Sequence, residues 1–477
     1  MPEHDTIAAI STPPGEGGIG IVRLSGPDAL HITSRIFSPR GRKKEKDLSG
    51  VSSRRMLYGF ITCPETGDLV DEVLVAVMRA PNTYTREDMV EINCHGGAHT
   101  LSRTMELVLR EGARLALPGE FTKRAFLEGR IDLTQAEAVL SLIRARSDAA
   151  GRAALAQLKG GLGGRIKQEA GRLARICAHL EASIDFPEEE IEPDEIAAIT
   201  AGIENIALSL KALSNSYEEG KLLMDGIRTA ILGRPNVGKS SLLNALLRQE
   251  RAIVTDIPGT TRDVIAEHIN LGGYSLKIMD TAGIREAVDR PEAEGVKRSL
   301  AAMEEADLVL CVLDGSAGVD KEDLRVMSLM KERQKKAILV INKKDLFADK
   351  KPWKTPELAD PELANGLFTQ GWPEICVSAK TGEGIEELKA SITACFRRKN
   401  PAEAECDSLI TSLRHKTALD KAHGALVRGL EAIGAGLPAE IVSLELSEAL
   451  RELGGITGEV STDDILAIIF NEFCIGK

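Results

Sequence analysis

The sequence predicts a multi-domain fold that combines α/β and purely α-helical parts, and three observations support this prediction. The chain of 477 residues is long enough for roughly three domains of ~150 residues each. Between about residues 226 and 398, near-continuous apolar strands alternate with helical stretches, which is typical of a parallel sheet covered on both faces. Helical sequence flanks this segment on both sides, so we expect it to be inserted into a helical domain.

Composition and charge narrow the class of protein. Only 3% of residues are aromatic, which favours packed helices over an all-β fold. The net charge of -12 argues against a generally basic nucleic-acid surface, although a local basic face is still allowed. The eight cysteines show no CxxC pair and no metal-ligand spacing, so we expect reduced thiols. The start lacks a basic signal peptide and no run approaches the ~18 apolar residues that span a bilayer, so we expect a cytoplasmic protein.

The elements divide the chain into four segments. Residues 1–118 alternate β-rich runs (IGIVRLSG, EVLVAVMRAP, DMVEINCHGG) with helical ones, which predicts an α+β domain. Residues 119–220 form the first part of a helical domain, where apolar residues spaced three and four apart from Leu155 to Ile184 predict one long helix. Residues 221–398 form the inserted domain, with strands IRTAILG, YSLKIMD, ADLVLCVLD, KKAILVINK and EICVSAK. Residues 399–477 complete the helical domain.

The segment GRPNVGKS, from Gly233 to Ser240, lies between a predicted strand and the helical stretch SLLNALL. Glycines there let backbone N–H groups turn inward and cradle an anion at a helix N-terminus. Lys239 would reach the β- and γ-phosphates of a nucleotide, and the Ser240 hydroxyl would ligate Mg²⁺. The pattern therefore predicts a P-loop nucleotide site in a doubly wound sheet.

Four further motifs follow this loop in order. GTTRD offers Thr261 as a second Mg²⁺ hydroxyl, and DTAG supplies the carboxylate Asp280 at the end of a strand. NKKD supplies Asp345, which can accept two hydrogen bonds from guanine but not from adenine, and SAK can donate a backbone N–H to the guanine oxygen. We therefore predict a Ras-like GTP-binding domain. Its predicted GTP-binding residues are Asn236, Val237, Gly238, Lys239, Ser240, Ser241, Thr255, Asp256, Ile257, Pro258, Gly259, Thr260, Thr261, Asp280, Thr281, Ala282, Gly283, Asn342, Lys343, Asp345, Ser378, Ala379 and Lys380.

The residue after DTAG is Ile284, where many GTPases place a glutamine that orients the attacking water. An aliphatic side chain cannot do this. Another group must therefore position the water and neutralise charge, either from the segments 252–263 and 284–296 or from a partner.

The whole chain resembles the family of tRNA modification GTPases called MnmE or TrmE. The resemblance rests on TPPGEGGIGIVRLSG, PNTYTREDMVEINCHGG, PGEFTKRAFLEGRIDLTQAEAV, GRPNVGKSSLLN, DIPGTTRD, DTAGIRE and the terminal FCIGK. It implies an N-terminal domain that binds tetrahydrofolate and forms a homodimer, and a helical domain that carries the G domain. It also implies action with the FAD-containing protein MnmG (GidA) on C5 of the tRNA wobble uridine, where a carboxymethylaminomethyl or aminomethyl group is added.

The resemblance also implies roles for single residues. Asn236, Thr255, Ile257 and Thr260 match positions that hold K⁺, which would stabilise developing charge. Glu292 matches the glutamate that helps orient the attacking water. Arg23, Glu91, Arg124 and Lys477 match folate-binding positions, where 5-formyl- or methylene-tetrahydrofolate would bind. The implied cofactors are thus GTP, Mg²⁺, K⁺ and a tetrahydrofolate.

The C-terminal segment NEFCIGK follows DDILAIIF, whose apolar residues at 465, 466, 468, 469 and 470 predict a packed last helix. That helix would direct Cys474 and Lys477 to the folate site. Cys474 is then a candidate catalytic thiol that adds to uracil C6, with a small buried hydrophobe as the alternative. A prenylation box is disfavoured because the chain ends in Lys477 and no polybasic stretch precedes it.

Two other functions also predict GTPase activity. A ribosome-assembly GTPase acting as an RNA-binding switch would need an RNA-binding domain, and we find no basic GxxG-type element. A membrane-remodelling GTPase would need an amphipathic or lipid-binding segment, and none stands out. The ribosome-assembly switch is the main alternative.

Overall fold

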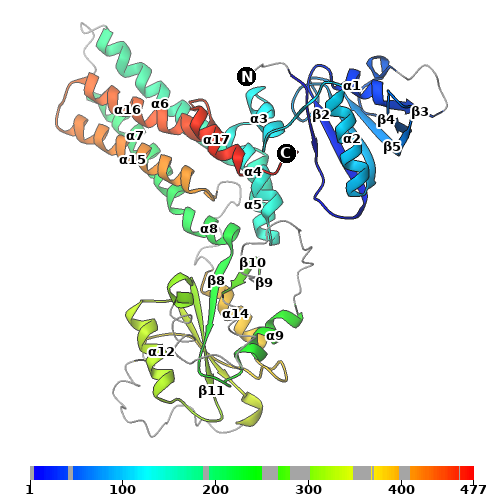
Figure 1. Ribbon diagram of the computed structural model, residues 1–477. Helices are drawn as coiled ribbons and strands as arrows, with labels where there is room; N and C mark the ends of the chain where they lie inside the picture. Colours follow the sequence, from blue (N-terminus) through cyan, green and yellow to red (C-terminus); the bar gives the residue numbers. More distant parts are fainter. Residues whose placement is uncertain are drawn as a thin grey trace.

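The structure is a computed structural model that describes residues 5–40, 47–185, 193–249, 267–279, 301–347, 367, 370–396, 409–460 and 462–477. Figure 1 shows a β-rich N-terminal part, a long helical part and an α/β part at the far end of the helices. The predicted multi-domain α/β and α architecture is confirmed.

The N-terminal part is a seven-stranded sheet in the order β3-β4-β5-β6-β2-β1-β7. Helices α1 and α2 cover one face, where Leu101 and Met105 join Val22 and Val75 in one core. Because side chains alternate along a strand, Arg23 of β2 lies on the other face. The elements are β1 Ile7–Ile10, β2 Gly17–Ser25, α1 Ala29–Ile36, β3 Phe37–Pro39, β4 Arg55–Thr62, β5 Leu69–Met78, β6 Met89–Gly96, α2 Ala98–Arg110 and β7 Arg114–Leu115.

The helical part is built from both sides of the inserted domain. Leu173 and Leu210, which precede the insertion, share a core with Leu426 and Leu446, which follow it. Figure 1 shows α6, α7, α15 and α16 running side by side. The helices are α3 Glu120–Leu127, α4 Leu133–Arg144, α5 Asp148–Leu158, α6 Gly161–Asp185, α7 Pro193–Asn215, α8 Tyr217–Asp225, α15 Leu413–Gly434, α16 Ala439–Thr457 and α17 Asp463–Asn471.

The single long helix predicted over 155–184 is wrong, because the structure breaks it at Lys159–Gly160. Gly160 has φ +92°, a left-handed conformation that favours glycine and ends α5. Because the spacing of apolar residues continues across the break, the sequence pattern does not reveal that the helix ends there. Leu155, the first residue of the pattern, is exposed.

The inserted domain is a six-stranded sheet in the order β13-β12-β11-β8-β10-β9, parallel except for the β10/β9 pair. Leu310 of β11 packs with α9 and α14, whereas its neighbour Val309 packs with α12 on the opposite face. The prediction of a parallel sheet covered on both faces is confirmed. The elements are β8 Ile227–Leu232, α9 Lys239–Gln249, β9 Glu267–Leu271, β10 Tyr274–Ile278, β11 Leu308–Asp314, α12 Lys321–Glu332, β12 Ala337–Asn342, β13 Glu374–Cys376 and α14 Ile385–Ala394.

The C-terminal helix α17 packs Leu466, Ile469 and Phe470 against α3 and α4. Ile468, which the sequence predicted to be packed, is 67% exposed because it lies on the outer face of the helix. Beyond α17, Ile475 forms a β-bridge with Pro118, so the last residues return to the N-terminal part.

Among the described residues, one stretch, Asp194–Asp225, is long and apolar enough to cross a membrane when only length and composition are considered. A third of its most apolar window is buried. Ile203, Ile206 and Leu210 of this stretch pack in the core of the helical part. These three residues therefore serve helix packing within the protein.

Candidate functional site

The loop Gly233–Gly238 connects β8 to the first turn of α9 at the carboxyl edge of the sheet. Gly233 has φ +148° and Gly238 has φ +98°. A Cβ on Gly238 would lie 2.2 Å from Nδ2 of Asn342, and one on Gly233 would lie 2.3 Å from the carbonyl oxygen of Val312. Both positions therefore require glycine, and the close approach brings the loop against β11 and β12.

Lys239 begins α9 and its side chain folds back over the loop. Its Nζ donates to the carbonyl oxygens of Gly233 at 2.8 Å and Arg234 at 2.7 Å. Burial lowers the pKa of Lys239, which is the direction expected for an ammonium partly removed from water. A bound phosphate oxygen would favour the charged form and accept a further hydrogen bond.

Two motifs from distant parts of the chain meet the P-loop. The side chain of Asn342 is buried; its Nδ2 donates to the Val237 carbonyl at 2.8 Å, and its Oδ1 accepts from the Ala379 N–H at 3.0 Å. The Ser378 hydroxyl donates to Asp345 Oδ1 at 2.6 Å. Asn342 thus joins the phosphate loop to the two loops predicted to hold the base.

Four further predicted residues of this site lie at the surface. Ser240 and Ser241 are exposed in the first turn of α9, Asn236 is exposed in the loop with φ +64°, and Lys380 is exposed. Lys343 pairs with Asp314. The following predicted residues lie outside the described residues: Thr255, Asp256, Ile257, Pro258, Gly259, Thr260, Thr261, Asp280, Thr281, Ala282, Gly283 and Glu292.

A second polar site lies on the face of the N-terminal sheet opposite α1 and α2, beside Phe121 of α3. Arg23 and Glu91 are direct partners on β2 and β6, and Arg23 Nε donates to Glu91 Oε1 at 2.9 Å. Arg23 Nη1 also donates to the carbonyl oxygen of Gly476 at 3.1 Å, which ties the C-terminal segment to the strand. No spacing along the chain reveals this pairing, which depends on how the strands align in the sheet.

The last residues of the chain complete this face. The Ser11 hydroxyl donates to the Gly476 carbonyl at 3.1 Å, and Gly476 has φ +97°. Burial lowers the pKa of Lys477, and the nearby charge of Arg23 lowers it further. Cys474 is exposed. The structure therefore brings Arg23, Glu91 and Lys477 together.

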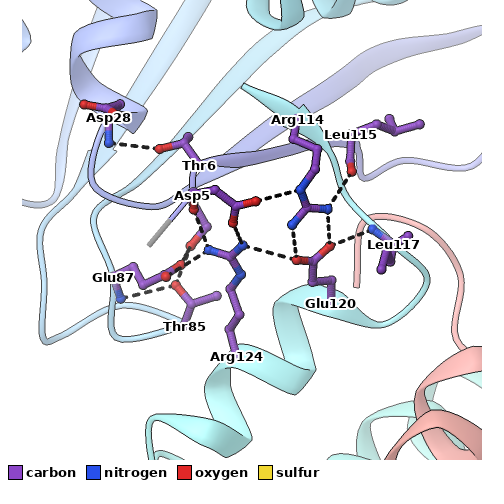
Figure 2. A network of polar contacts seen from close by, with 11 residues as sticks. Asp5, Thr6, Asp28, Thr85, Glu87, Arg114, Leu115, Leu117, Glu120 and Arg124 are labelled. Carbon is purple, nitrogen blue, oxygen red and sulfur yellow. Dashed lines mark hydrogen bonds and ion pairs between the residues drawn. The ribbon is translucent and has the colours of Figure 1, made fainter. Parts of the chain in front are cut away.

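Arg124 belongs to a network of ion pairs around α3. Its guanidinium group donates to Glu87 Oε1 at 3.0 Å, to Glu120 Oε1 at 3.1 Å and to the carbonyl oxygen of Asp5 at 2.8 Å. Arg114 bridges Asp5 and Glu120 beside it, so two arginines and three carboxylates form one network (Figure 2). The hydrogen bonds described for Arg124 all lie within this network, and none of them joins it directly to Arg23, Glu91 or Lys477.

Comparison with known protein families gives two matches. A family model described as the MnmE helical domain matches residues 133–474, and one described as the GTP-binding protein TrmE N-terminus matches residues 6–130. Together they span the N-terminal and helical parts and enclose the inserted domain.

Full-length relatives are also found. The chain is 48% identical over 476 residues to the tRNA modification GTPase MnmE of Carboxydothermus hydrogenoformans, covering 99% of this chain and 100% of that protein. It is 48% identical over 475 residues to the protein of the same name in Moorella thermoacetica, covering 99% of each. Among solved structures, Aquifex aeolicus Era bound to GDP and aluminium fluoride is 26% identical over 41% of this chain and 65% of that one, with a TM-score of 0.25.

Proposed function

This chain belongs to the family of tRNA modification GTPases called MnmE, and from this premise we propose how its parts divide the work. The protein is a GTP hydrolase that acts in tRNA modification, and its nucleotide site takes GTP with Mg²⁺. We propose that it modifies C5 of the wobble uridine with a carboxymethylaminomethyl or aminomethyl group, in the cytoplasm. The relatives do not favour the alternative of a ribosome-assembly switch.

The proposal that the site binds GTP rests on the side chain of Asn342, which contacts two other loops of the domain. Its side chain links the P-loop to the loop of Ala379, while the carboxylate of Asp345 lies beside Ser378. A carboxylate there can accept from the N1–H and the exocyclic amine of guanine. In the reaction, Lys239 would bind the β- and γ-phosphates and stabilise the charge that develops as the γ-phosphoryl group leaves.

K⁺ is the proposed substitute for an arginine finger. Asn236 offers its exposed side-chain amide at the surface of the P-loop, and an amide oxygen is a suitable ligand for a hard cation. Thr255, Ile257 and Thr260 would contribute with it, and Glu292 would help orient the attacking water. We expect K⁺ to raise GTP turnover well above that in Na⁺, and Asn236→Ala to remove the difference. Equal turnover of the unchanged protein in both salts would contradict this role.

A tetrahydrofolate is the proposed ligand of the face formed by Arg23, Glu91 and Lys477. The cation–carboxylate pair holds Glu91 in position to accept from the amino edge of a pterin, and the lysine ammonium can bind a carboxylate or carbonyl oxygen. The folate carries the one-carbon unit when it is bound. Arg124 is the fourth proposed folate residue, and its guanidinium group is held in the network that fastens α3.

Binding of 5-formyl-tetrahydrofolate measured by calorimetry tests this assignment. Lys477→Ala and Glu91→Gln are expected to weaken binding by tenfold or more, because each loses a charge-assisted hydrogen bond worth ~1.5–3 kcal/mol. Arg103→Ala, which removes an exposed ion pair with Glu106 on α2, is the matched control. Equal affinity in all three variants would place the folate elsewhere.

Cys474 is the proposed nucleophile toward uracil. Addition of its thiolate to C6 would make C5 nucleophilic, and the thiolate would leave again once C5 carries its substituent and has lost its proton. The exposure of Cys474 near Lys477 supports this role. A tRNA product unchanged by Cys474→Ser would exclude it.

We propose a homodimer, assembled through the N-terminal part, and a hetero-oligomer with MnmG. On the face of the N-terminal sheet opposite α1 and α2, Met56 is 61% exposed, and Tyr58 and Leu74 are each 42% exposed. These residues lie on the neighbouring strands β4 and β5. Exposed apolar side chains of this size on adjacent strands are typical of an interface. Sedimentation of Met56→Glu as a monomer, beside a dimeric unchanged protein, is the expected result.

A further inference from the structure

Arg234 follows the first glycine of the P-loop, and its side chain leaves the loop toward the start of α12. Its Nη1 lies 2.6 Å from Asp320 Oδ2, and its Nε lies 2.9 Å from Asp323 Oδ2. Its Nη2 donates to the carbonyl oxygen of Gly318 at 3.1 Å. One side chain thus contacts three acceptors on the segment that begins α12. We name Arg234, Asp320 and Asp323 the loop clamp.

The acceptors of the loop clamp are themselves fixed. Asp320 is the N-cap of α12 and accepts from the N–H groups of Glu322 and Asp323, while Asp323 accepts from the N–H of Asp320 at 3.2 Å. The Asp323 side chain is fully buried, and that of Arg234 is 20% exposed. Burial raises the pKa of Asp323 to about 6, against the opposing effect of Arg234.

The backbone of Arg234 faces the nucleotide site. Its carbonyl oxygen, together with that of Gly233, accepts the hydrogen bonds that Lys239 Nζ donates within the described part of the chain. The orientation of these two peptide groups therefore sets where the ammonium group points. A lysine ammonium is a compact charge on a flexible stem, so its position depends on such acceptors.

We propose that Arg234 is a positioning residue for GTP hydrolysis: anchored on Asp320 and Asp323, it holds the two carbonyl groups that aim Lys239 at the β- and γ-phosphates. Arg234 itself need not touch GTP. Its effect passes through Lys239, whose charge must lie where negative charge develops in the transition state. An error of about 1 Å in such a group can cost ~100-fold in rate.

Steady-state GTP hydrolysis by the full-length protein tests this role through separate values of kcat and KM. Arg234→Ala is expected to lower kcat by on the order of 10- to 100-fold and to raise KM, because Lys239 contributes to binding and to the transition state. Arg234→Lys should recover part of the loss, since it can reach one of the two carboxylates.

Arg228→Ala is the matched control. Arg228 forms an ion pair of similar geometry with Asp307 in the same domain, with Nη2 and Oδ1 2.8 Å apart, but at the opposite end of β8 from the loop. It should change kcat and KM by less than about twofold. Equal kinetic constants for Arg234→Ala and Arg228→Ala would overturn the proposal.

Arg234→Ala leaves the buried carboxylate of Asp323 without its counter-ion, which can unfold the domain. The double variant Arg234→Met with Asp323→Asn removes both charges, and the asparagine oxygen still accepts from the Asp320 N–H. We expect this folded variant to lose kcat as Arg234→Ala does. Unchanged turnover in the double variant would show that the loop clamp does not position Lys239.

Discussion

Asp345 and Ser378 come from separate loops that the sheet brings together, and their hydrogen bond of 2.6 Å fixes the carboxylate at the edge of the nucleotide site. At the scale of single residues, this carboxylate should decide which base is bound. Guanine offers it two N–H donors, whereas xanthine replaces the amine with a carbonyl group.

Asp345→Asn is therefore expected to weaken GTP binding by on the order of 100-fold or more and to improve binding of xanthosine triphosphate. Competition binding with the two nucleotides measures the change. Glu383→Gln, an exposed residue of the neighbouring loop paired with Lys344, should leave both affinities unaltered. An unaltered preference for GTP in Asp345→Asn would remove Asp345 from base recognition.

Glu137 of α4 is a second residue with a measurable signature. It pairs with Arg414 at 2.9 Å and with His415 at 2.5 Å, both from α15. Burial alone would raise the pKa of Glu137, but the charges and hydrogen bonds of His415 and Arg414 lower it to about 2. The charged carboxylate is thus stabilised only in the folded protein.

A depressed pKa contributes stability that is present above the unfolded value near 4.5 and is lost as pH falls toward about 2. The contribution is about 3 kcal/mol at neutral pH, from ~1.4 kcal/mol per pKa unit. Chemical unfolding at several pH values should show stability falling between pH 5 and 2, with a shallower fall in Glu137→Gln. Glu431→Gln, at an exposed position of α15, should keep the slope of the unchanged protein.

At the scale of elements, the network of Figure 2 fastens α3 to the start of β1. The side chain of Arg124 is 13% exposed and faces Asp5, Glu87 and Glu120. Arg124→Ala would take the arginine from Glu87, while Asp5 and Glu120 keep Arg114, so we expect a loss of about 1–3 kcal/mol in unfolding free energy. Arg103→Ala, at an exposed pair, should cost ~1 kcal/mol or less. Equal losses in the two variants would mean that the network does not hold the helix.

The break between α5 and α6 allows a paired glycine test. Gly160 has φ +92°, so Gly160→Ala should destabilise the protein by ~1 kcal/mol or more. Gly164 is an exposed residue inside α6, where an added Cβ would meet no atom within 4 Å, so Gly164→Ala should stabilise the protein by ~0.5–1 kcal/mol. Thermal unfolding measures both, and the same sign in both variants would contradict the assigned helix end.

These elements also show what the sequence could predict. The strands around Leu310 and Val340 were predicted because buried parallel strands are apolar at nearly every position. The break at Gly160 was missed because the helical spacing of apolar residues continues across it. Short strands such as β1 and β7 carry too few residues for a period to be recognised.

The functional sites show the same difference between features that are local in the sequence and features that depend on long-range contacts. The P-loop and the guanine motifs were predicted because each is a short local pattern with a chemical reason. The pairing of Arg23 with Glu91 and the tail follows from contacts 68 and 453 residues apart, which no spacing reveals. The sequence did not indicate a role for Arg234, because it occupies a variable position of the motif. Its acceptors at the start of α12 lie more than 80 residues further along the chain.

At the scale of the whole molecule, the chain leaves the helical part for the GTPase domain and returns to it, and its last residues reach the N-terminal sheet. The terminal segment therefore contacts the site of Arg23 and Glu91 directly. We propose that GTP hydrolysis and this second site serve one tRNA modification.

Mass analysis of tRNA nucleosides tests that claim most directly. A strain lacking the gene would be complemented with the full chain, with the chain ending at Glu472, or with Asp345→Asn. We predict that the modified wobble uridine is absent without the gene, returns with the full chain, and does not return with either variant. Nucleosides unchanged by the deletion, or restored by the chain ending at Glu472, would contradict the account.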